Sequence, residues 1–411
     1  MKSFFASVEC ADRGLNPMTA NLVVADESRT DKTICLAISP AMKKLGVKNR
    51  CRLFEIPKNI EYIIAPPRMK KYIEYASEIY SIYLKYVSKE DIHVYSIDEC
   101  FLDVTDYLKI YKTDAKSLVK QLMREIWDKL SIPSSAGIGT NLYLAKIALD
   151  ITAKHSVDSI GVLDEEKFIQ TLSTHRPITD FWGISTGTAL RLEKIGVYDM
   201  KGISQMNEDI LYKIFGINAE LLIDHSKGIE TCQMSDIKNY KTRSKSISQS
   251  QILPENYSFS DAKLVLKEML QNGCYEMAKF GFSSDHVGIG VVYGDVKGEM
   301  VKGTKNMAET TNLYSIIVDY VSALYDSIVD KTRPVRRLSY VFYGLVPESD
   351  ERYDFFTDMT KINKQKRLVN SVLDVREKFG KNSLLKAIDL TACATQKDRN
   401  SQIGGHKSGE D

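Results

Sequence analysis

Two adjacent acids, Asp98 and Glu99, stand inside an otherwise apolar, strand-like run from Val94 to Val104. Carboxylates without partners are costly to bury, and a cation usually compensates them. Hard oxygen ligands on a β-hairpin suit Mg²⁺ that holds a nucleotide triphosphate. The alternative is a hairpin tip whose acids face water, because acidic dipeptides are common in turns. Spacing alone leaves both interpretations open.

Strands and helices alternate around this pair, as a mixed α/β domain requires. The pattern predicts a short strand within residues 1–10, helices at 69–87, 113–130 and 141–151, a strand at 134–139, and two strands, LVVAD and TICLAIS, within residues 11–65. The acidic hairpin therefore belongs to a domain in which helices pack on short strands.

After residue 160 the pattern changes three times. Residues 161–230 are mostly helical, and a polar linker at 231–242 follows. A second α/β unit at 243–346 has helices at 260–279 and 310–329. The remaining residues, 347–411, are highly charged, with one amphipathic helix at 361–379 and a Gly- and Ser-containing end that we expect to be mobile.

Size and composition narrow the function classes. A chain of 411 residues needs two to four domains. The net charge of +2 excludes a polycation, so any DNA contact must come from local basic patches. Seven scattered cysteines without a CxxC pair argue against zinc and for a reducing compartment. Without a membrane-length apolar run or a signal peptide, we expect a cytoplasmic protein.

Several segments together resemble one family. YSIDECFLDV resembles the acidic hairpin of the Y-family (translesion) DNA polymerases, and KSFFASVEC resembles that family's opening strand and helix. AGIGTNLYLAKIALDITAK resembles the following palm segment, and KSISQSQIL and PVRRLSYVFYG resemble its extra DNA-binding domain. The end, RNSQIGGHK, looks like the tail of the UmuC-type branch in Gram-positive bacteria and their mobile elements.

The resemblance implies an α+β, right-hand polymerase with a ferredoxin-like palm, small fingers, a helical thumb and a separate α/β little finger. The expected boundaries are 1–10 and 66–160 for the palm, 11–65 for the fingers, 161–230 for the thumb, 231–242 for a linker, 243–346 for the little finger and 347–411 for the tail.

The start of the chain departs from the family pattern. In the family a metal-binding aspartate immediately precedes the position of Met1, so this sequence carries two of three expected carboxylates. Two divalent ions placed close together need bridging acids to offset their repulsion. We expect either that the protein begins further upstream or that this product is a weak or inactive polymerase.

The resemblance assigns roles at the expected nucleotide site. Asp98 and Glu99 would be catalytic ligands of two Mg²⁺ ions, with the Met1 carbonyl oxygen as a backbone ligand. Phe5 would be the steric gate that excludes a 2′-hydroxyl; alternatively it is an aromatic residue buried at a helix start. Phe4 is a second nucleotide-binding candidate, for which a core position fits better.

Cations must neutralise the triphosphate. Lys43 and Lys154 occupy positions where the family has phosphate-binding side chains, and Ser39 is a further nucleotide-binding candidate. The basic run around Lys43 is otherwise an ordinary solvated face. Pro40 stands where the family has a tyrosine, which leaves the geometry of phosphate contact open.

Further segments resemble DNA-binding parts. The stretch FWGISTGTAL resembles a helix-hairpin-helix, whose backbone N–H groups at Gly183, Ser185 and Gly187 would meet a DNA phosphate, although a plain packing unit is the competing interpretation. In the little finger the candidates for backbone contacts are Arg243, Lys245, Arg336 and Arg337.

The tail contains a short aromatic motif. Residues Arg352, Tyr353, Asp354, Phe355 and Phe356 resemble the peptide by which bacterial polymerases dock on the sliding clamp, without its leading glutamine. A surface loop with chance aromatics is the alternative.

The leading hypothesis is therefore a DNA-dependent DNA polymerase of the error-prone translesion type. It would add dNTPs to primer-template DNA in SOS damage tolerance, with the sliding clamp and accessory SOS proteins as partners. The second hypothesis is a DNA- and clamp-binding protein without catalysis. The third is a nucleotide cyclase, which the thumb and little-finger segments disfavour.

Overall fold

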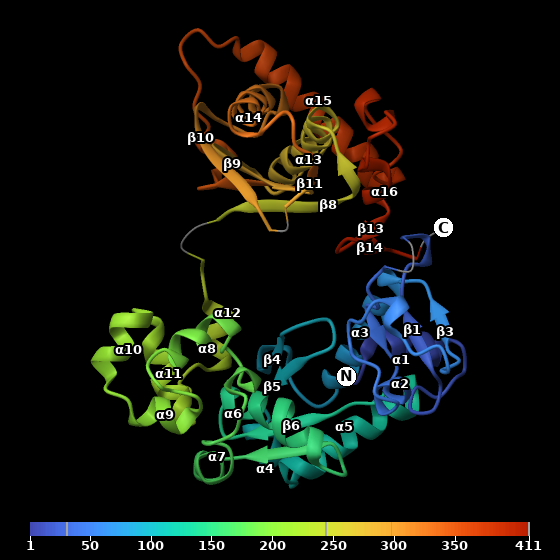
Figure 1. Ribbon diagram of the computed structural model, residues 1–411, viewed down its shortest axis with the longest axis vertical. Helices are drawn as coiled ribbons and strands as arrows, with labels where there is room; N and C mark the ends of the chain where they lie inside the picture. Colours follow the sequence, from blue (N-terminus) through green and yellow to red (C-terminus); the bar gives the residue numbers. More distant parts are fainter. Residues whose placement is uncertain (30–31, 243–244, 297, 410–411) are drawn as a thin grey trace. The chain divides into compact units, whose positions relative to one another are not determined.

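The computed structural model describes residues 1–29, 32–242, 245–296 and 298–409. They form two units, shown in Figure 1, of which the first comprises Met1–Tyr240 with His406–Asp411 and the second Lys241–Gly405. The predicted mixture of helices and strands is confirmed. None of the helices in these ranges is long and apolar enough to cross a membrane.

The first unit opens with α1 (Phe4–Asp12), so the short strand predicted before it is wrong. Met1 and Lys2 each donate a hydrogen bond to a different segment, at Asp98 and Pro133. Ser3 then turns the backbone into the left-handed region, with φ of 47°. The opening residues therefore connect two parts of the unit without forming a ladder.

A three-stranded sheet follows, in the order β2-β1-β3. β1 is antiparallel to β2 and parallel to β3. The strands and helices of this region are β1 (Leu22–Val24), η1 (Glu27–Arg29), β2 (Ala37–Ile38), α2 (Pro40–Lys44), η2 (Leu53–Glu55) and β3 (Ile63–Ala65). Both strands predicted for residues 11–65 are present.

The acidic hairpin is β4 (Ile92–Val94) and β5 (Cys100–Leu102), paired from Ile92 with Leu102 to Val94 with Cys100. It packs with α1, α3 and α5 around one apolar core that includes Phe4, Ile79 and Leu122. The neighbouring helices are α3 (Met69–Tyr83), η3 (Lys89–Asp91), α4 (Thr105–Tyr111) and α5 (Ala115–Leu130).

A second strand pair, β6 (Ala136–Gly139) and β7 (Ile160–Leu163), is parallel. In the region predicted as a ferredoxin-like palm, β4-β5 and β6-β7 are thus two separate two-stranded pairs. The predicted helix at 141–151 is α6 (Leu142–Ile147), a π-helical turn η4 (Ala148–Thr152) and η5 (Ala153–His155). A Cβ at Gly137 would lie 2.0 Å from the Ala145 carbonyl oxygen, so only glycine lets α6 approach β6 this closely.

The predicted helical thumb consists of short helices around one core that includes Tyr143 and Phe168. The segment predicted as a linker at 231–242 contains α12, whose polar sequence gives no apolar period. The elements are α7 (Glu165–Thr171), η6 (Ile178–Asp180), α8 (Thr186–Glu193), α9 (Met200–Gln205), α10 (Glu208–Phe215), α11 (Asn218–Ser226) and α12 (Met234–Asn239).

The second unit is an antiparallel sheet in the order β10-β9-β11-β8, with β12 paired to β9. In Figure 1 α13 and α14 cover one face of this sheet. The elements are β8 (Ile247–Tyr257), α13 (Phe259–Lys279), β9 (Phe282–Tyr293), β10 (Met300–Thr311), α14 (Tyr314–Ile328), β11 (Val335–Tyr343) and β12 (Val346–Pro347). The helix predicted from residue 310 begins four residues later, because β10 extends to Thr311.

The tail makes polar contacts with α13, and the mobility expected for its Gly- and Ser-containing end stays a prediction. Lys386 donates a hydrogen bond to Gln271, and the Thr395 N–H donates to Glu268, both on α13. The elements are η7 (Glu348–Asp350), α15 (Met359–Phe379), η8 (Ala387–Leu390), α16 (Gln396–Asn400) and β13 (Gln402–Ile403), while β14 (His406–Lys407) belongs to the first unit. Polar side chains hold this segment, which is why its composition gave no sign of order.

Candidate active site

The turn between β4 and β5 positions the two acids. The N–H groups of Tyr95 and Ser96 both donate to the Glu99 carbonyl oxygen, at 3.0 and 3.1 Å. The Ser96 hydroxyl donates to Asp98 Oδ1 at 2.8 Å, and the Met1 amino group donates to the Asp98 carbonyl oxygen at 2.7 Å. Both carboxylates are half-buried. Hydrogen bonds therefore fix this turn, and the start of the chain lies beside it.

A buried lysine that the sequence analysis missed accompanies Glu99. Lys146 Nζ on α6 lies 2.6 Å from Glu99 Oε2 and 3.4 Å from Asp150. Burial opposes its charge, but the hydrogen bond to Glu99 and the charge of Asp150 raise the pKa of Lys146. Its spacing of four residues from Asp150 was the available signal, since such pairs share a helix face.

The two predicted aromatic residues separate into different environments. Phe4 is 4% exposed and lies in the apolar core, in agreement with the core alternative given for it. Phe5 is half-buried, and its ring stacks on Tyr72 with centroids 4.5 Å apart. The Tyr72 hydroxyl donates to buried Glu9, which Arg68 also binds through two nitrogens, at 3.0 and 2.7 Å. A fixed support therefore holds the Phe5 ring.

Lysines gather in the same unit. Partial burial lowers the pKa of Lys43, and the charge of Lys154 adds to this effect. Burial likewise lowers the pKa of Lys2, with a contribution from Lys44. Lys2, which the sequence analysis did not single out, donates a hydrogen bond to Ser159 at 2.6 Å. Like charges held this close make a surface that favours an anion.

Ser39, predicted as a nucleotide-binding candidate, has a structural role at the start of α2. Its side chain is fully buried. Its hydroxyl oxygen accepts hydrogen bonds from the N–H groups of Leu22 and Met42, both at 3.3 Å, and caps α2. Since Pro40 occupies the first helical position, the residue before it is the natural cap.

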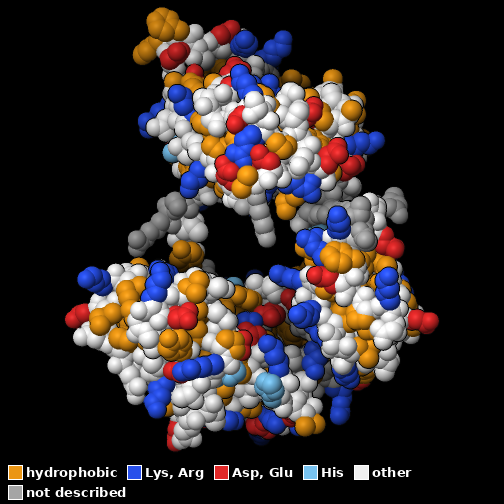
Figure 2. All heavy atoms as spheres, in the orientation of Figure 1, with side chains coloured by type: hydrophobic (Ala, Val, Ile, Leu, Met, Phe, Trp, Pro, Cys, Tyr) orange, Lys and Arg blue, Asp and Glu red, His pale blue; other side chains and the backbone are white. Residues whose placement is uncertain are grey.

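Figure 2 shows the first unit hollowed in the middle, with acidic side chains inside the hollow and Lys and Arg side chains on its flank. Carboxylates beside cations suit a ligand that carries both metal and phosphate. No three His, Cys, Asp or Glu side chains of the described ranges are grouped to hold a metal. The available donors are the two hairpin carboxylates and neighbouring backbone oxygens, and these hard donors fit Mg²⁺.

The predicted helix-hairpin-helix has one α-helix. Gly183 makes the turn with φ of 88°, and the Ser185 hydroxyl accepts the Thr188 N–H at 3.2 Å to cap α8, in which Gly187 lies. The element before the turn is only the single 3₁₀ turn η6. Trp182 in this segment donates its indole N–H to the Tyr95 hydroxyl at 3.0 Å.

In the second unit the predicted basic residues lie on or beside the sheet. Leu338, Tyr340 and Phe342 on β11 face the core with α13, so Arg337 lies on the uncovered face, where it donates to Ser250 at 3.1 Å. Lys245 is exposed, with its Nζ 4.5 Å from the Phe282 ring centroid, while Arg336 is half-buried. The predicted Arg243 lies outside the described residues.

The tail motif is anchored at one end. Arg352 pairs with Thr310 at the end of β10, and the Tyr353 hydroxyl lies 2.9 Å from Thr311 Oγ1. Beyond this anchor the Asp354 carboxylate accepts the Phe356 N–H. Phe355 and Phe356 are 105% and 97% exposed, respectively.

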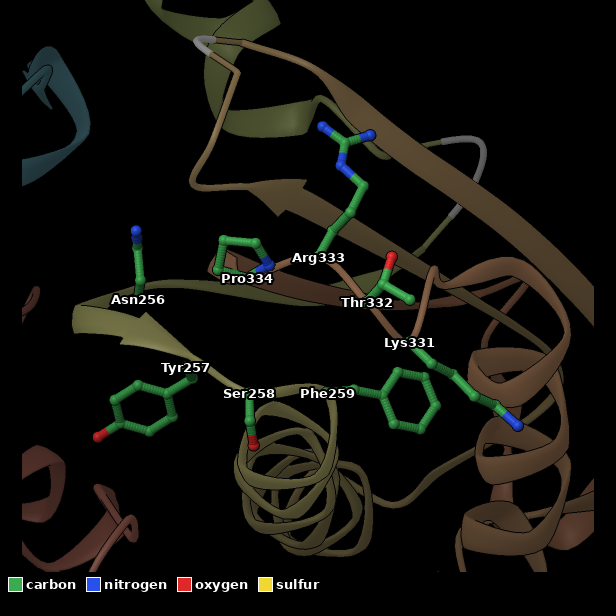
Figure 3. A pocket seen from close by; sticks show the side chains of 8 residues that line it. All are labelled: Asn256, Tyr257, Ser258, Phe259, Lys331, Thr332, Arg333 and Pro334. Carbon is green, nitrogen blue, oxygen red and sulfur yellow. The ribbon is translucent and has the colours of Figure 1, made fainter.

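A cavity of about 240 Å³ in the second unit was not predicted. It is lined by Asn256, Tyr257, Ser258, Phe259, Lys331, Thr332, Arg333 and Pro334 (Figure 3). The Arg333 guanidinium is already paired with Asp295 and Glu299 and packs on the Tyr293 ring. The Arg333 guanidinium is therefore not available to bind a ligand in this cavity.

Comparisons with known proteins agree with this geometry. Residues 1–150 match the impB/mucB/samB family. The chain is 30% identical to the putative UV-damage repair protein UvrX of Bacillus subtilis over 416 residues, covering 99% of this chain and 96% of UvrX. It is also 30% identical to DNA polymerase IV 2 of Bacillus subtilis over 420 residues, covering 99% and 97%.

The fold has a counterpart among solved structures. A Y-family DNA polymerase chimera of Dbh and Dpo4 matches with a TM-score of 0.65 at 23% identity, covering 84% of this chain and 97% of that one. An insertion ternary complex of Dbh DNA polymerase matches with a TM-score of 0.51. The likeness confirms the predicted right-hand polymerase fold.

The chain belongs to the impB/mucB/samB family, the Y-family translesion DNA polymerases, and is a DNA-directed DNA polymerase. Its two relatives from Bacillus subtilis agree with the predicted family.

Proposed function

We propose that this polymerase adds dNTPs to primer-template DNA, including damaged template, with Asp98 and Glu99 as its metal-binding carboxylates. The observation that carries the proposal is their position at one hydrogen-bonded turn, beside the backbone of Met1. Together with the Met1 carbonyl oxygen they would hold two divalent ions. Such ions, when bound, neutralise the triphosphate and activate the primer 3′-hydroxyl.

The remaining groups position the reactants. Lys43 and Lys154 would offset the negative charge of the triphosphate. Their ammonium groups repel each other when no anion is bound, so a bound triphosphate would relieve this repulsion. The Phe5 ring, supported by Tyr72, would pack against the deoxyribose and leave no room for a 2′-hydroxyl. Phosphoryl transfer depends mainly on such positioning and charge neutralisation.

Two surfaces would bind the DNA backbone. In the first unit these are the backbone N–H groups at Gly183, Ser185 and Gly187 near the start of α8. In the second unit the uncovered face of the sheet carries Arg337 beside small residues, since Ser250, Ser339 and Gly290 are paired across adjacent strands. Lys245 and Arg336 would add charge. Contacts of this kind bind phosphates without reading sequence.

Templated primer extension tests this function. The full chain is incubated with Mg²⁺, one dNTP at a time, and a primer on either an undamaged template or one with a UV photoproduct. We expect incorporation of the complementary nucleotide, lost on chelation of the metal. Tight DNA binding without incorporation on either template would contradict the proposal and favour a non-catalytic DNA-binding protein.

We also propose that the tail motif docks on the sliding clamp. Two phenylalanine rings almost fully open to solvent, on a segment anchored at Tyr353, suit an apolar groove on a partner. Replacing Phe355 and Phe356 with Ala should weaken clamp binding in a direct titration by at least about tenfold. The control is Phe379→Ala, an exposed ring elsewhere in the tail. Equal loss in both variants would contradict docking through the motif.

A further inference from the structure

We propose that Lys146 is the resident counter-ion of Glu99 and sets the divalent metal concentration at which the site fills. The inference rests on the proposed function, because it takes Glu99 as a metal ligand. It goes beyond that function because it gives Lys146 a role that requires no contact with nucleotide or DNA.

The contacts of Lys146 carry the inference. Its side chain is 8% exposed, and its Nζ is shared between Glu99 at 2.6 Å and Asp150 at 3.4 Å. The ammonium also lies 5.3 Å from the centroid of the Tyr95 ring. Without metal, this ammonium compensates the Glu99 carboxylate at hydrogen-bond distance, and the charge of the Met1 amino group adds to it.

The lysine has little freedom to leave. The Tyr95 ring lies under it, and the Trp182 indole holds the Tyr95 hydroxyl. Asp150 lies one helical turn after Lys146 and offers a second acceptor. When a metal takes Glu99, Lys146 can shift its hydrogen bond to Asp150 and keep a charged partner. Because Lys146 can move from Glu99 to Asp150, metal can bind Glu99 without leaving the buried ammonium unpaired.

The electrostatic consequence has a definite sign. A positive charge hydrogen-bonded to a metal ligand both occupies one of its oxygens and repels an incoming cation. Metal binding without nucleotide and DNA is therefore weaker than the carboxylates alone would give. Removing the ammonium should strengthen metal binding, whereas a residue that merely oriented Glu99 would weaken binding when removed.

Direct Mn²⁺ titration of the full chain, without DNA or nucleotide and with free Mn²⁺ read by electron paramagnetic resonance, tests this. We expect Lys146→Met to bind Mn²⁺ at least about tenfold more tightly than the natural chain, and Lys146→Arg to bind it similarly to the natural chain. Unchanged or weaker binding by Lys146→Met would overturn the inference. Circular dichroism and thermal unfolding establish that each variant is folded.

Two further variants separate this inference from the proposed function. Glu99→Gln should weaken Mn²⁺ binding; if it does not, Glu99 is no ligand, and both the metal site and the role of Lys146 fail. If Glu99→Gln weakens binding but Lys146→Met has no effect, only the inference fails. Asp150→Asn leaves Lys146 wholly to Glu99 and should weaken binding, and most of that loss should vanish in the Lys146→Met background. An equal loss in both backgrounds would overturn the exchange.

Discussion

At the scale of single residues, several side chains near α1 bind one another or pack in the core. Glu9, Arg68 and Tyr72 are bound to one another, and Phe4 is in the core. Phe5 differs from these, because one face of its ring rests on Tyr72 while the side chain remains partly open.

Replacing Phe5 with Ala should relax sugar selection. Without the ring, a 2′-hydroxyl no longer clashes, so the ratio of kcat/KM for a dNTP to that for the matching rNTP should fall by at least about tenfold. Steady-state primer extension with each nucleotide measures this ratio. Phe54→Ala, the same change at an exposed position, serves as control. If both variants keep the natural ratio, Phe5 does not contact the sugar.

At the scale of secondary structure elements, the sheet of the second unit presents one uncovered face with Arg337 on β11. Arg337→Ala should weaken primer-template binding to a similar degree for all sequences. It should also reduce the slope of log Kd against log salt by about one, as expected for one lost phosphate contact. Fluorescence anisotropy over a salt series measures both quantities.

Arg333→Ala is the matched control, since the Arg333 guanidinium is already bound by two carboxylates. An unchanged salt slope for Arg337→Ala, or an equal change in both variants, would show that Arg337 makes no phosphate contact.

The contact between α13 and the tail should make the second unit sensitive to pH. Glu268 on α13 is 1% exposed and accepts a hydrogen bond from the Thr395 N–H, and burial raises its pKa from 4.5 to about 7. Between these values the folded protein keeps a proton that the unfolded chain loses. The contribution of Glu268 to stability is therefore fully present below pH 4.5 and declines by about 3 kcal/mol as pH rises through 7.

Glu268→Gln should remove this decline. Cys274, buried on the same helix, reports opening of the unit when its thiol is labelled in urea at a fixed labelling pH after equilibration at different pH values. Exposed Glu276→Gln is the control. A pH dependence that survives in Glu268→Gln would show that another group causes it.

The same elements show what a sequence can predict. Long amphipathic helices such as α3, α5 and α13 were found within a few residues, because their apolar period is strong. The helix α12 was missed because it is short and polar. The structural role of Ser39 was not predicted, because its hydroxyl accepts hydrogen bonds from two backbone N–H groups and nothing in the local sequence reveals the second donor, Leu22.

At the site, the adjacent acids of the hairpin could be singled out because they interrupt an apolar run. The partner of Glu99 could not, since Lys146 lies 47 residues further along the chain and meets it only through folding. The contacts of the tail could not be predicted for the same reason, because they depend on distant polar partners on α13.

At the scale of the whole molecule, the chain forms two units with separate apolar cores, and its relatives match it along nearly its entire length. The family therefore covers the α/β unit with the sheet as well as the unit with the acidic hairpin. A polymerase needs a site for phosphoryl transfer and a surface for DNA, because DNA binding depends on contacts spread over the DNA backbone.

The most direct measurement is the rate of single-nucleotide incorporation by the full chain with Mg²⁺, compared among Asp98→Asn, Glu99→Gln and Asp103→Asn. Asp103 lies close by in the sequence, but its carboxylate accepts hydrogen bonds from the N–H and the hydroxyl of Thr105 at the start of α4, so it is the matched control. Loss of a metal ligand should remove several kcal/mol of transition-state stabilisation. We therefore expect both active-site variants to lose at least about a thousandfold in rate while Asp103→Asn stays near the natural rate. Incorporation by Asp98→Asn or Glu99→Gln as fast as by Asp103→Asn would contradict the assignment of the hairpin carboxylates.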